Sequence, residues 1–301
     1  MIKSLTVTNP KGESLKLELT RPERSGLIIQ SIEGLGPTKA TINTSETATM
    51  DGSLFNSARA SNRNIVITFA LMFAPTIEDS RHKIYKYFPV KKRVRLDVET
   101  DTRLVYTHGY VETIEPNIFS NQETVQVSLV CPDAYFHEAE QTASGFYGVE
   151  PLFQFPFSNE SYTEDMLVLS NIRLDSRAIL NYKGDADAGA LISIYARGPA
   201  KNLTLYNTGT SEKLTIDTDK IKTITGRAFG AEDDIRISTV KGNLYVRLLR
   251  DGRYTNIISA LGKGSNFFQL SNGDNIFAFT ADEGDDNLVI TFTYNNAYGG
   301  A

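Results

Sequence analysis

The stretch VQVSLVCPDAYFHEAEQTASG, from Val125 to Gly145, contains the change of pattern that divides the chain. In its first half apolar residues alternate with polar ones, and Val125, Val127 and Leu129 fall on one face. Such a period of two residues predicts a β-strand with one buried side. After Cys131 come a proline, two aromatic residues and a run of polar residues without a period. The strand therefore closes one folded unit, and a connector follows it.

Upstream of this stretch, the period of two residues recurs along most of the chain. The segments MIKSLTVT (1–8) and ESLKLELT (13–20) flank the turn formers NPKG and predict a β-hairpin. The run NIVITFALMFAP (64–75) is apolar on both faces, which is typical of a strand covered on both sides. One helix is predicted over 77–88, because Thr76 can cap its start and a proline ends it.

Downstream of the connector, short strand patterns return from Met166 onward and are separated by turn residues. Roughly eight or nine strands at this spacing predict a β-sandwich. No stretch after the helix has a convincing helical period. We therefore expect a mainly β protein with an N-terminal domain over 1–135, a connector over 136–165 and a C-terminal β-sandwich over 166–301.

The composition is that of an ordinary globular protein of 301 residues, with 41% hydrophobic and 22% charged residues. The net charge is −5 and the acidic excess lies after residue 136, so direct nucleic-acid recognition is not expected. The apolar runs are about half as long as the roughly 20 residues of a membrane span, and the N-terminus has no signal-type apolar block. A single cysteine excludes an intramolecular disulfide framework and fits synthesis in a reducing cytoplasm.

Cys131, with His137 close behind it, is the first candidate for catalysis, because a catalytic cysteine needs a nearby base. No glycine elbow or oxyanion loop flanks the pair, and a lone cysteine ending an apolar strand is more simply a buried residue. The other histidines, His82 and His108, have no zinc-type spacing. Among the acid-rich turns, DEGDD (282–286) is the best candidate for calcium, but it lacks the pattern of a calcium loop. The residues alone therefore predict no catalytic site and no cofactor, and leave a structural or binding role open.

Short motifs follow one another in order along nearly the whole chain. In the first half they are Gly36-Pro37, Asp51-Gly52, Arg59, Arg63-Asn64-Ile65 and Cys131-Pro132-Asp133. In the second half they are GALISIYARGPAKNLTLYN, DIRISTVKG, LGKGSNFFQLSNGDNIFAF and NAYGG. The series resembles the distal tail protein (Dit) family of long-tailed, siphovirus-type bacteriophages that infect Gram-positive hosts. Ala134 stands where the family commonly has a proline, which is a small departure.

The resemblance implies both a fold and a role. In that family, an N-terminal split-barrel or β-sandwich-like domain with one helix forms a hexameric ring around a central channel through which the genome passes. The ring joins the tail tube to the hub that carries the tail-associated lysin or tail fibre. A C-terminal galectin-like β-sandwich projects outward and docks receptor-binding or baseplate proteins. The resemblance thus implies a non-enzymatic structural virion protein of the tail tip or baseplate, made in the host bacterial cytoplasm and not inserted in a membrane.

Two segments are expected to form the contacts between copies in such a ring. The segment MDGSLFNSARASNRN (50–64) is too polar for a core and too long for a casual loop, so we expect an exposed loop or edge excursion that lies against a neighbouring protomer. Its arginines would suit acidic partners. The second segment is the N-terminal hairpin. The expected interface side chains are Leu5, Val7, Arg59, Asn62, Arg63 and Asn64.

Two other functions stay open from the sequence. The first is a saccharide-binding tail protein, whose C-terminal sandwich would contact host cell-wall glycan. Sugar platforms usually use exposed aromatic rings, and tryptophan is absent, so tyrosines would have to serve. The candidates for such a saccharide or partner contact are Tyr195, Tyr206, Tyr245 and Tyr254. The second is a tail-tip glycan hydrolase, although no pair of carboxylates is singled out for that chemistry.

Overall fold

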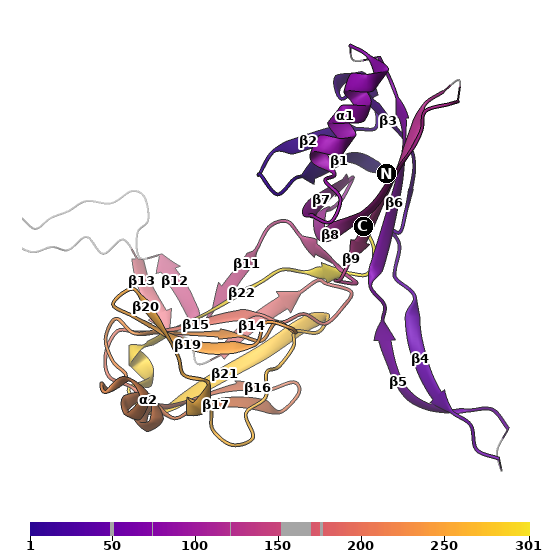
Figure 1. Cartoon of the computed structure of the whole chain (residues 1–301). Coiled ribbons are helices and arrows are strands. Elements are labelled where there is room, and N and C mark those ends of the chain that lie inside the picture. Colours follow the sequence, from indigo (N-terminus) through magenta and orange to yellow (C-terminus); the bar gives the residue numbers. More distant parts are fainter. Residues whose placement is uncertain (49–50, 74, 121, 152–169, 175–176) are drawn as a thin grey trace, which may run out of the picture. The chain divides into compact units, whose positions relative to one another are not determined.

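The computed structural model describes residues 1–48, 51–73, 75–120, 122–151, 170–174 and 177–301 (Figure 1). The chain is mainly β and divides into two compact units. The N-terminal unit comprises Met1–Glu140 together with Ala297–Ala301, and the inserted unit comprises Gln141–Asn296. The chain therefore returns to the N-terminal unit at residue 297, whereas the boundaries expected from the sequence grouped these residues with the C-terminal sandwich.

An antiparallel sheet of nine strands forms the N-terminal unit. Seven strands lie in the order β2 (Ser14–Glu18), β1 (Ile2–Thr8), β7 (Arg93–Thr100), β8 (Leu104–Asn117), β9 (Thr124–Cys131), β6 (Arg63–Leu71) and β3 (Leu27–Glu33). Beside them, β10 (Phe136–Glu138) pairs with β8 and with β23 (Ala297–Tyr298). Alternation along β7 places Val94, Leu96 and Val98 in the core and turns Arg93 and Arg95 away from it. One face of the sheet is therefore buried, as the period of two residues predicts.

Strand β6 differs from its expected form. Ile65, Ile67 and Phe69 fill the core as expected, but Val66 and Thr68 on the other face are only half-buried. Ala70 of that face is buried and Met72 is half-buried, so the other face is covered in part. The apolar content of the run overstated how much of the outer face is packed.

Helix α1 (Ile77–Tyr87) lies where the sequence predicts a helix, after a short 3₁₀ turn, η1 (Pro22–Arg24), earlier in the unit. The Asp79 amide donates to Thr76 Oγ1 at 3.1 Å, which caps the first turn. Ile84 and Phe88 are fully buried, and the Phe88 ring lies 5.8 Å from the Phe69 ring. The apolar side of the helix therefore packs on the core of the sheet.

Residues 297–301 complete the N-terminal unit. The Ala301 amide donates to the Leu35 carbonyl at 3.0 Å, close to the point where β23 pairs with β10. Tyr298 is only 4% exposed and belongs to the same hydrophobic core as Leu5 and Ile65. Burying such an aromatic side chain contributes about 2 kcal/mol. These residues are thus part of the core, although they follow the whole inserted unit in the sequence.

A separate two-stranded hairpin consists of β4 (Ala40–Ser45) and β5 (Leu54–Ala60). It forms the long arm that extends from the sheet in Figure 1. Every residue of both strands is exposed. Much of the segment 50–64 therefore forms one strand of this arm, and the rest of the N-terminal unit does not bury that strand.

Two antiparallel sheets share one hydrophobic core in the inserted unit, as expected for a β-sandwich. The larger sheet has the order β11 (Thr142–Gly145), β22 (Leu288–Tyr294), β15 (Leu191–Ala196), β18 (Asp234–Ser238), β19 (Tyr245–Arg250) and β20 (Arg253–Asn256). The smaller sheet has the order β14 (Arg177–Tyr182), β21 (Gly273–Glu283), β16 (Lys201–Asn207) and β17 (Glu212–Ile216). A further hairpin pairs β12 (Tyr147–Pro151) with β13 (Ser170–Leu174). The rest of the expected connector, from 152 to 165, lies outside the described residues.

Helix α2 (Thr218–Thr225) corrects the expectation that no helix follows residue 88. The Asp217 carboxylate accepts hydrogen bonds from the amides of Asp219 and Lys220, and Gly226 ends the helix in the left-handed conformation. Ile221 is its one buried apolar side chain. A helix of two turns with one such residue shows no helical period, so only its caps could have identified it. Two 3₁₀ turns, η2 (Ile258–Ala260) and η3 (Asp285–Asn287), complete the unit.

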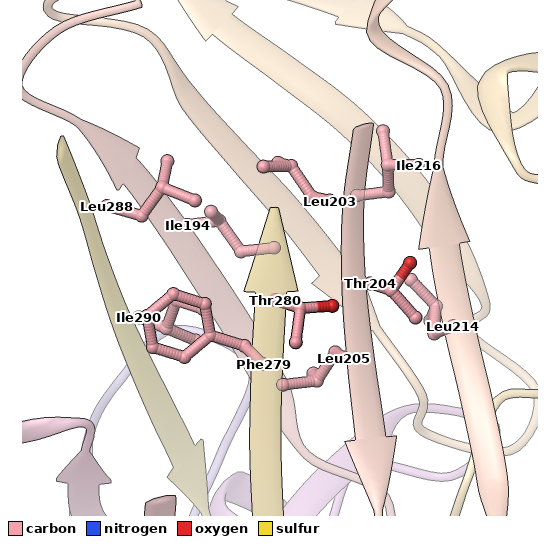
Figure 2. Close-up of a pocket in the computed structure, with 10 residues that line it drawn as sticks. All are labelled: Ile194, Leu203, Thr204, Leu205, Leu214, Ile216, Phe279, Thr280, Leu288 and Ile290. Carbon is pink, nitrogen blue, oxygen red and sulfur yellow. The ribbon is translucent and has the colours of Figure 1, made fainter. Parts of the chain in front are cut away.

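A small pocket lies in the core between the two sheets of the inserted unit (Figure 2). Its lining consists of eight apolar side chains and two threonines: Ile194, Leu203, Thr204, Leu205, Leu214, Ile216, Phe279, Thr280, Leu288 and Ile290. No titratable side chain lines this pocket. It therefore offers no acid, base or nucleophile for catalysis.

Candidate functional site

The pair Cys131 and His137 does not form a catalytic site in the structure. Cys131 is 1% exposed, and burial raises the pKa of its thiol to about 11, so it stays protonated at neutral pH. His137 instead lies with its Nε2 2.7 Å from Asp133 Oδ2, and its ring is 5.8 Å from Tyr106. Tyr106 neighbours the buried Thr107 in β8, so the histidine and the thiol lie on opposite faces of the sheet.

The acid-rich turns have partners within their own unit. Asp282 accepts a hydrogen bond from Asn202 at 2.8 Å, and Glu283 lies 3.7 Å from Lys201. The buried Asp233 accepts two hydrogen bonds from the Arg250 guanidinium, each of 2.6 Å. In the part of the chain that the structure describes, no three His, Cys, Asp or Glu side chains are grouped so that they could hold a metal ion. None of its helices is long and apolar enough to span a membrane.

Arg63 lies inside the N-terminal unit, with 1% of its surface exposed. Its guanidinium donates to four backbone carbonyls at 2.5–2.7 Å, those of Gly34, Gly36, Ala134 and Gly299. It also stacks on the Phe136 ring at 4.2 Å. Burial lowers the pKa of Arg63 from its usual range, and Nε is without a partner among the described residues. The interface role expected for Arg63 stays a prediction, while its guanidinium already joins three segments of one unit.

The other residues expected from the segment 50–64 are accessible. Arg59 is exposed on β5 opposite Thr41, and Asn62 is exposed just after that strand. Asn64 is also exposed, although its Oδ1 accepts a hydrogen bond from Ser128 at 3.1 Å. The arm therefore presents Arg59 and Asn62 without committing either side chain to the core.

Most apolar side chains of the arm lie on one face, and Leu54, which pairs with Ser45, lies on the other, mainly polar face. Cross-strand pairing places Ala40 opposite Ala60, Ile42 opposite Ala58 and Thr44 opposite Phe55. The apolar arm face is defined by the apolar members of these pairs, Ala40, Ile42, Phe55, Ala58 and Ala60. On the other face, Asn43 Nδ2 donates to Ser57 Oγ at 3.0 Å, beside Thr41 and Arg59. Phe55 is 68% and Ile42 62% exposed, which is unusual for such side chains in a strand.

Leu5 and Val7 of the N-terminal hairpin are fully buried in the core of the N-terminal unit. Their strand, β1, lies between β2 and β7. A contact between copies through this hairpin would therefore use the edge of β2 and not these two side chains.

The four candidate tyrosines fall on two different sheets. Tyr195, Tyr245 and Tyr254 lie on the outer face of the larger sheet, and the register places Tyr195 and Tyr254 in one row across β15, β18, β19 and β20. Tyr206 is on β16 in the smaller sheet, where it is 38% exposed. The structure thus brings three of the four candidates together.

Arginines accompany these tyrosines, although no motif in the sequence marks them. Arg247 lies 4.5 Å from the Tyr245 ring, and Arg236 lies 5.9 Å from the Tyr254 ring. The segments DIRIS and YVRLLR alternate in burial, and an arginine between two buried apolar residues projects from the outer face of a sheet. This alternation is the sequence pattern that could have identified both arginines.

Comparison with known proteins relates part of the N-terminal unit to a phage tail domain by its sequence, and the whole chain to a phage protein by its fold alone. Residues 12–131 match the family model described as phage tail protein RIFT-related domain. The Dit protein (gp 19.1) of phage SPP1, described as a paradigm of the hub adsorption apparatus in phages infecting Gram-positive hosts, aligns with a TM-score of 0.62. It is 13% identical, over 97% of this chain and 99% of that chain. A search of curated proteins finds no match.

Two structures of the activated baseplate of phage P2 are more distantly similar. The one with calcium has a TM-score of 0.47 and 10% identity, over 98% of both chains. The one with strontium has a TM-score of 0.44 and 10% identity, over 97% of both chains. Residues 12–131 of the N-terminal unit therefore carry a phage tail protein RIFT-related domain, and the fold of the whole chain is similar to that of the SPP1 Dit protein.

Proposed function

We propose that this tail protein is a ring-forming adaptor at the tail tip, in which six copies surround a central channel. The ring joins the tail tube to the hub that carries the tail-associated lysin or tail fibre. The inserted unit docks receptor-binding or baseplate proteins at the periphery. The matched domain supports a more general role, that of a structural component of the tail or baseplate. The adaptor role is more specific, because it names the proteins that the ring joins.

The arm of β4 and β5 is the observation that carries this proposal. A two-stranded hairpin is marginal in water on its own, and this one has no core of its own because all its strand residues are exposed. An exposed strand with an apolar face is an aggregation liability unless another surface covers it. A sister copy is the cover that a closed ring supplies, because each copy then presents its arm to the next one.

The energetic gain per arm is appreciable. Phe55 and Ile42 keep most of their surface exposed in the single chain, so covering them removes that surface from water. Each would contribute about 1–2 kcal/mol per contact. Six such contacts in a ring reinforce one another, because every copy is held on two sides.

The test measures the mass and shape of the purified full chain by light scattering and negative-stain imaging. The wild type is expected to form six-fold rings with a central hole. The double variant Ile42→Ser/Phe55→Ser should remain monomeric with an unchanged thermal midpoint, because neither side chain supports the core. Asn43→Ser, a change of the polar face of the same arm, is the matched control and should leave the ring intact.

Arg59→Ala separates a charged contribution from the apolar one. The Arg59 guanidinium is exposed, so its removal should weaken the ring without affecting folding. Arg63 is unsuitable for this purpose, because its loss would disturb its own unit. A wild type that stays monomeric at high concentration, or rings that persist in Ile42→Ser/Phe55→Ser, would overturn the proposal.

The proposal includes no enzymatic activity. The buried, protonated Cys131 and the apolar lining of the pocket in the inserted unit supply no nucleophile or acid–base pair. Incubation of the purified chain with cell-wall glycan should release no soluble fragments. Fragment release that survives extensive purification would contradict this part of the proposal.

A further inference from the structure

Two arginines lie side by side on the outer face of the larger sheet. Arg236 of β18 and Arg247 of β19 are direct cross-strand partners. Ile235, Ile237 and Val246, which flank them, are buried, so both arginines project away from the core. Like charges directly opposite each other in an antiparallel pair are destabilising. The sheet therefore carries an unfavourable pair of positive charges in the middle of an accessible face.

Among the described residues, a carboxylate partner is found for Arg236 but not for Arg247. Arg236 Nε donates to Asp234 Oδ2 at 2.9 Å, and this hydrogen bond raises the pKa of the guanidinium. Asp234 is 8% exposed and also accepts from Ser193 Oγ at 2.7 Å, so each oxygen of its carboxylate accepts one hydrogen bond. Arg247 contacts the Tyr245 ring, and no carboxylate of the described residues lies within ion-pair distance of it. Its guanidinium is open to an anion from outside.

Aromatic rings and polar donors surround this open charge. In the adjacent row of the same face, which runs through Asp234 and Leu249, Tyr195 and Tyr254 lie at the two ends and are 40% and 54% exposed. Asn256 lies directly opposite Arg247. Neighbouring strands are about 4.8 Å apart, so the row from β15 to β20 spans about 14 Å. A ligand that uses the whole row is longer than a single ion or a single sugar.

We propose that this face of the larger sheet binds an anionic polysaccharide, a glycan chain that carries carboxylate or phosphate groups. Arg247 holds an anionic group of the chain, with Arg236 beside it, and the tyrosine rings pack against the apolar faces of the sugars. The inserted unit has more acidic than basic residues, so general charge attraction does not explain such binding. The local pair of arginines has to supply it.

The surface favours a glycan over an acidic peptide. A peptide usually docks by adding a strand to a sheet edge or by filling apolar pockets. The outer sheet face offers tyrosine rings in one row and guanidinium groups with the Asn256 amide in the next, whereas an added strand at the β20 edge would be separated from Arg247 by β20 itself. A glycan chain presents hydroxyl groups and anions to such donors along its whole length. The inference does not depend on the ring, because every residue in it belongs to one unit of one chain.

The test is calorimetric titration of the full chain with two probes, polygalacturonate and phosphomannan, at low salt. At least one probe should bind, and binding should weaken as salt is added. Arg247→Gln should weaken it at least about tenfold, which is the effect of losing one charged contact of about 1.4 kcal/mol. Arg177→Gln removes an exposed arginine from the smaller sheet and should change the affinity by less than about twofold.

A second readout separates binding from structural support. Because Arg247→Gln removes one of two opposed like charges, its thermal midpoint without ligand should equal or exceed that of the wild type. A lowered midpoint would mean that Arg247 supports the fold, and would overturn the assignment. Failure of both probes to bind, or equal binding by Arg247→Gln, would also overturn it. If neutral dextran or polyglutamate bound with the same affinity, the surface would not be specific for an anionic glycan, and the proposal would be overturned.

Discussion

Replacing Arg63 by methionine tests whether a buried guanidinium holds the N-terminal unit together. The change keeps the length and apolar volume of the side chain and removes four hydrogen bonds to carbonyls from three chain segments. A hydrogen bond from a charged donor contributes about 1.5–3 kcal/mol, but desolvation of the guanidinium offsets part of the sum. The lowered pKa of Arg63 and its unpartnered Nε show that this desolvation is substantial. We expect Arg63→Met to lower the free energy of unfolding of the N-terminal unit by about 3–4 kcal/mol.

Hydrogen exchange read by mass spectrometry gives the stability of each unit separately. Amides of β6, β8 and β9 should exchange faster in Arg63→Met, while amides of β15 and β18 in the inserted unit should keep their protection. Calorimetry should show one transition lowered by about 10 °C. Arg63→Lys should recover only part of the loss, because an ammonium group cannot reach four carbonyls in the plane of a guanidinium.

Arg59→Met is the matched control, because it makes the same chemical change on an exposed strand. It should alter the free energy of unfolding by less than about 0.5 kcal/mol. A loss below about 1 kcal/mol in Arg63→Met would refute the role of this cluster, because unsatisfied buried carbonyls would then cost little. Equal losses in both units would refute its assignment to the N-terminal unit.

Three further outcomes follow from single positions. Burial raises the pKa of the Cys131 thiol to about 11, so a thiol reagent at pH 8 should label the native chain far more slowly than the urea-unfolded chain. The stability that the neutral thiol contributes is fully present below the usual thiol pKa and should be lost as the pH rises toward 11. Gly12 and Gly34 both have φ of +83°, but a Cβ at Gly34 would lie 1.9 Å from the Asn64 carbonyl oxygen, and a Cβ at Gly12 would meet nothing within 4 Å. Thermal unfolding should therefore show a loss of about 1 kcal/mol for Gly12→Ala and a clearly larger one for Gly34→Ala. Asp217→Ala removes the cap of α2 and should cost about 1 kcal/mol in urea unfolding, with faster exchange confined to that helix.

Local patterns in the sequence predicted most of the sheets and the first helix. In β7 the alternation of Val94 and Leu96 with Arg93 and Arg95 has a period of two residues, and the structure confirms which face is buried. The cap and stop signals around 77–88 likewise located α1. These signals succeed because they depend only on neighbours in the chain.

Contacts between distant segments could not be predicted in the same way. Arg63 follows an exposed arm in the sequence, and nothing local indicates that carbonyls of Gly34 and Gly299 converge on it. The two residues of β23 are too few to show any period. The open charge of Arg247 was missed for a related reason, since only the strand register reveals that Arg236 lies directly opposite.

The pairing of β23 with β10 also fixes the order in which the molecule can be finished. During translation, the ribosome reaches residue 297 only after it has made the whole inserted unit. Until then, a nascent chain lacks both Tyr298 and the Gly299 carbonyl that accepts from Arg63. We therefore expect polypeptides cut short by a premature stop codon to be poor building blocks, so that unfinished subunits are kept out of the virion by their own topology.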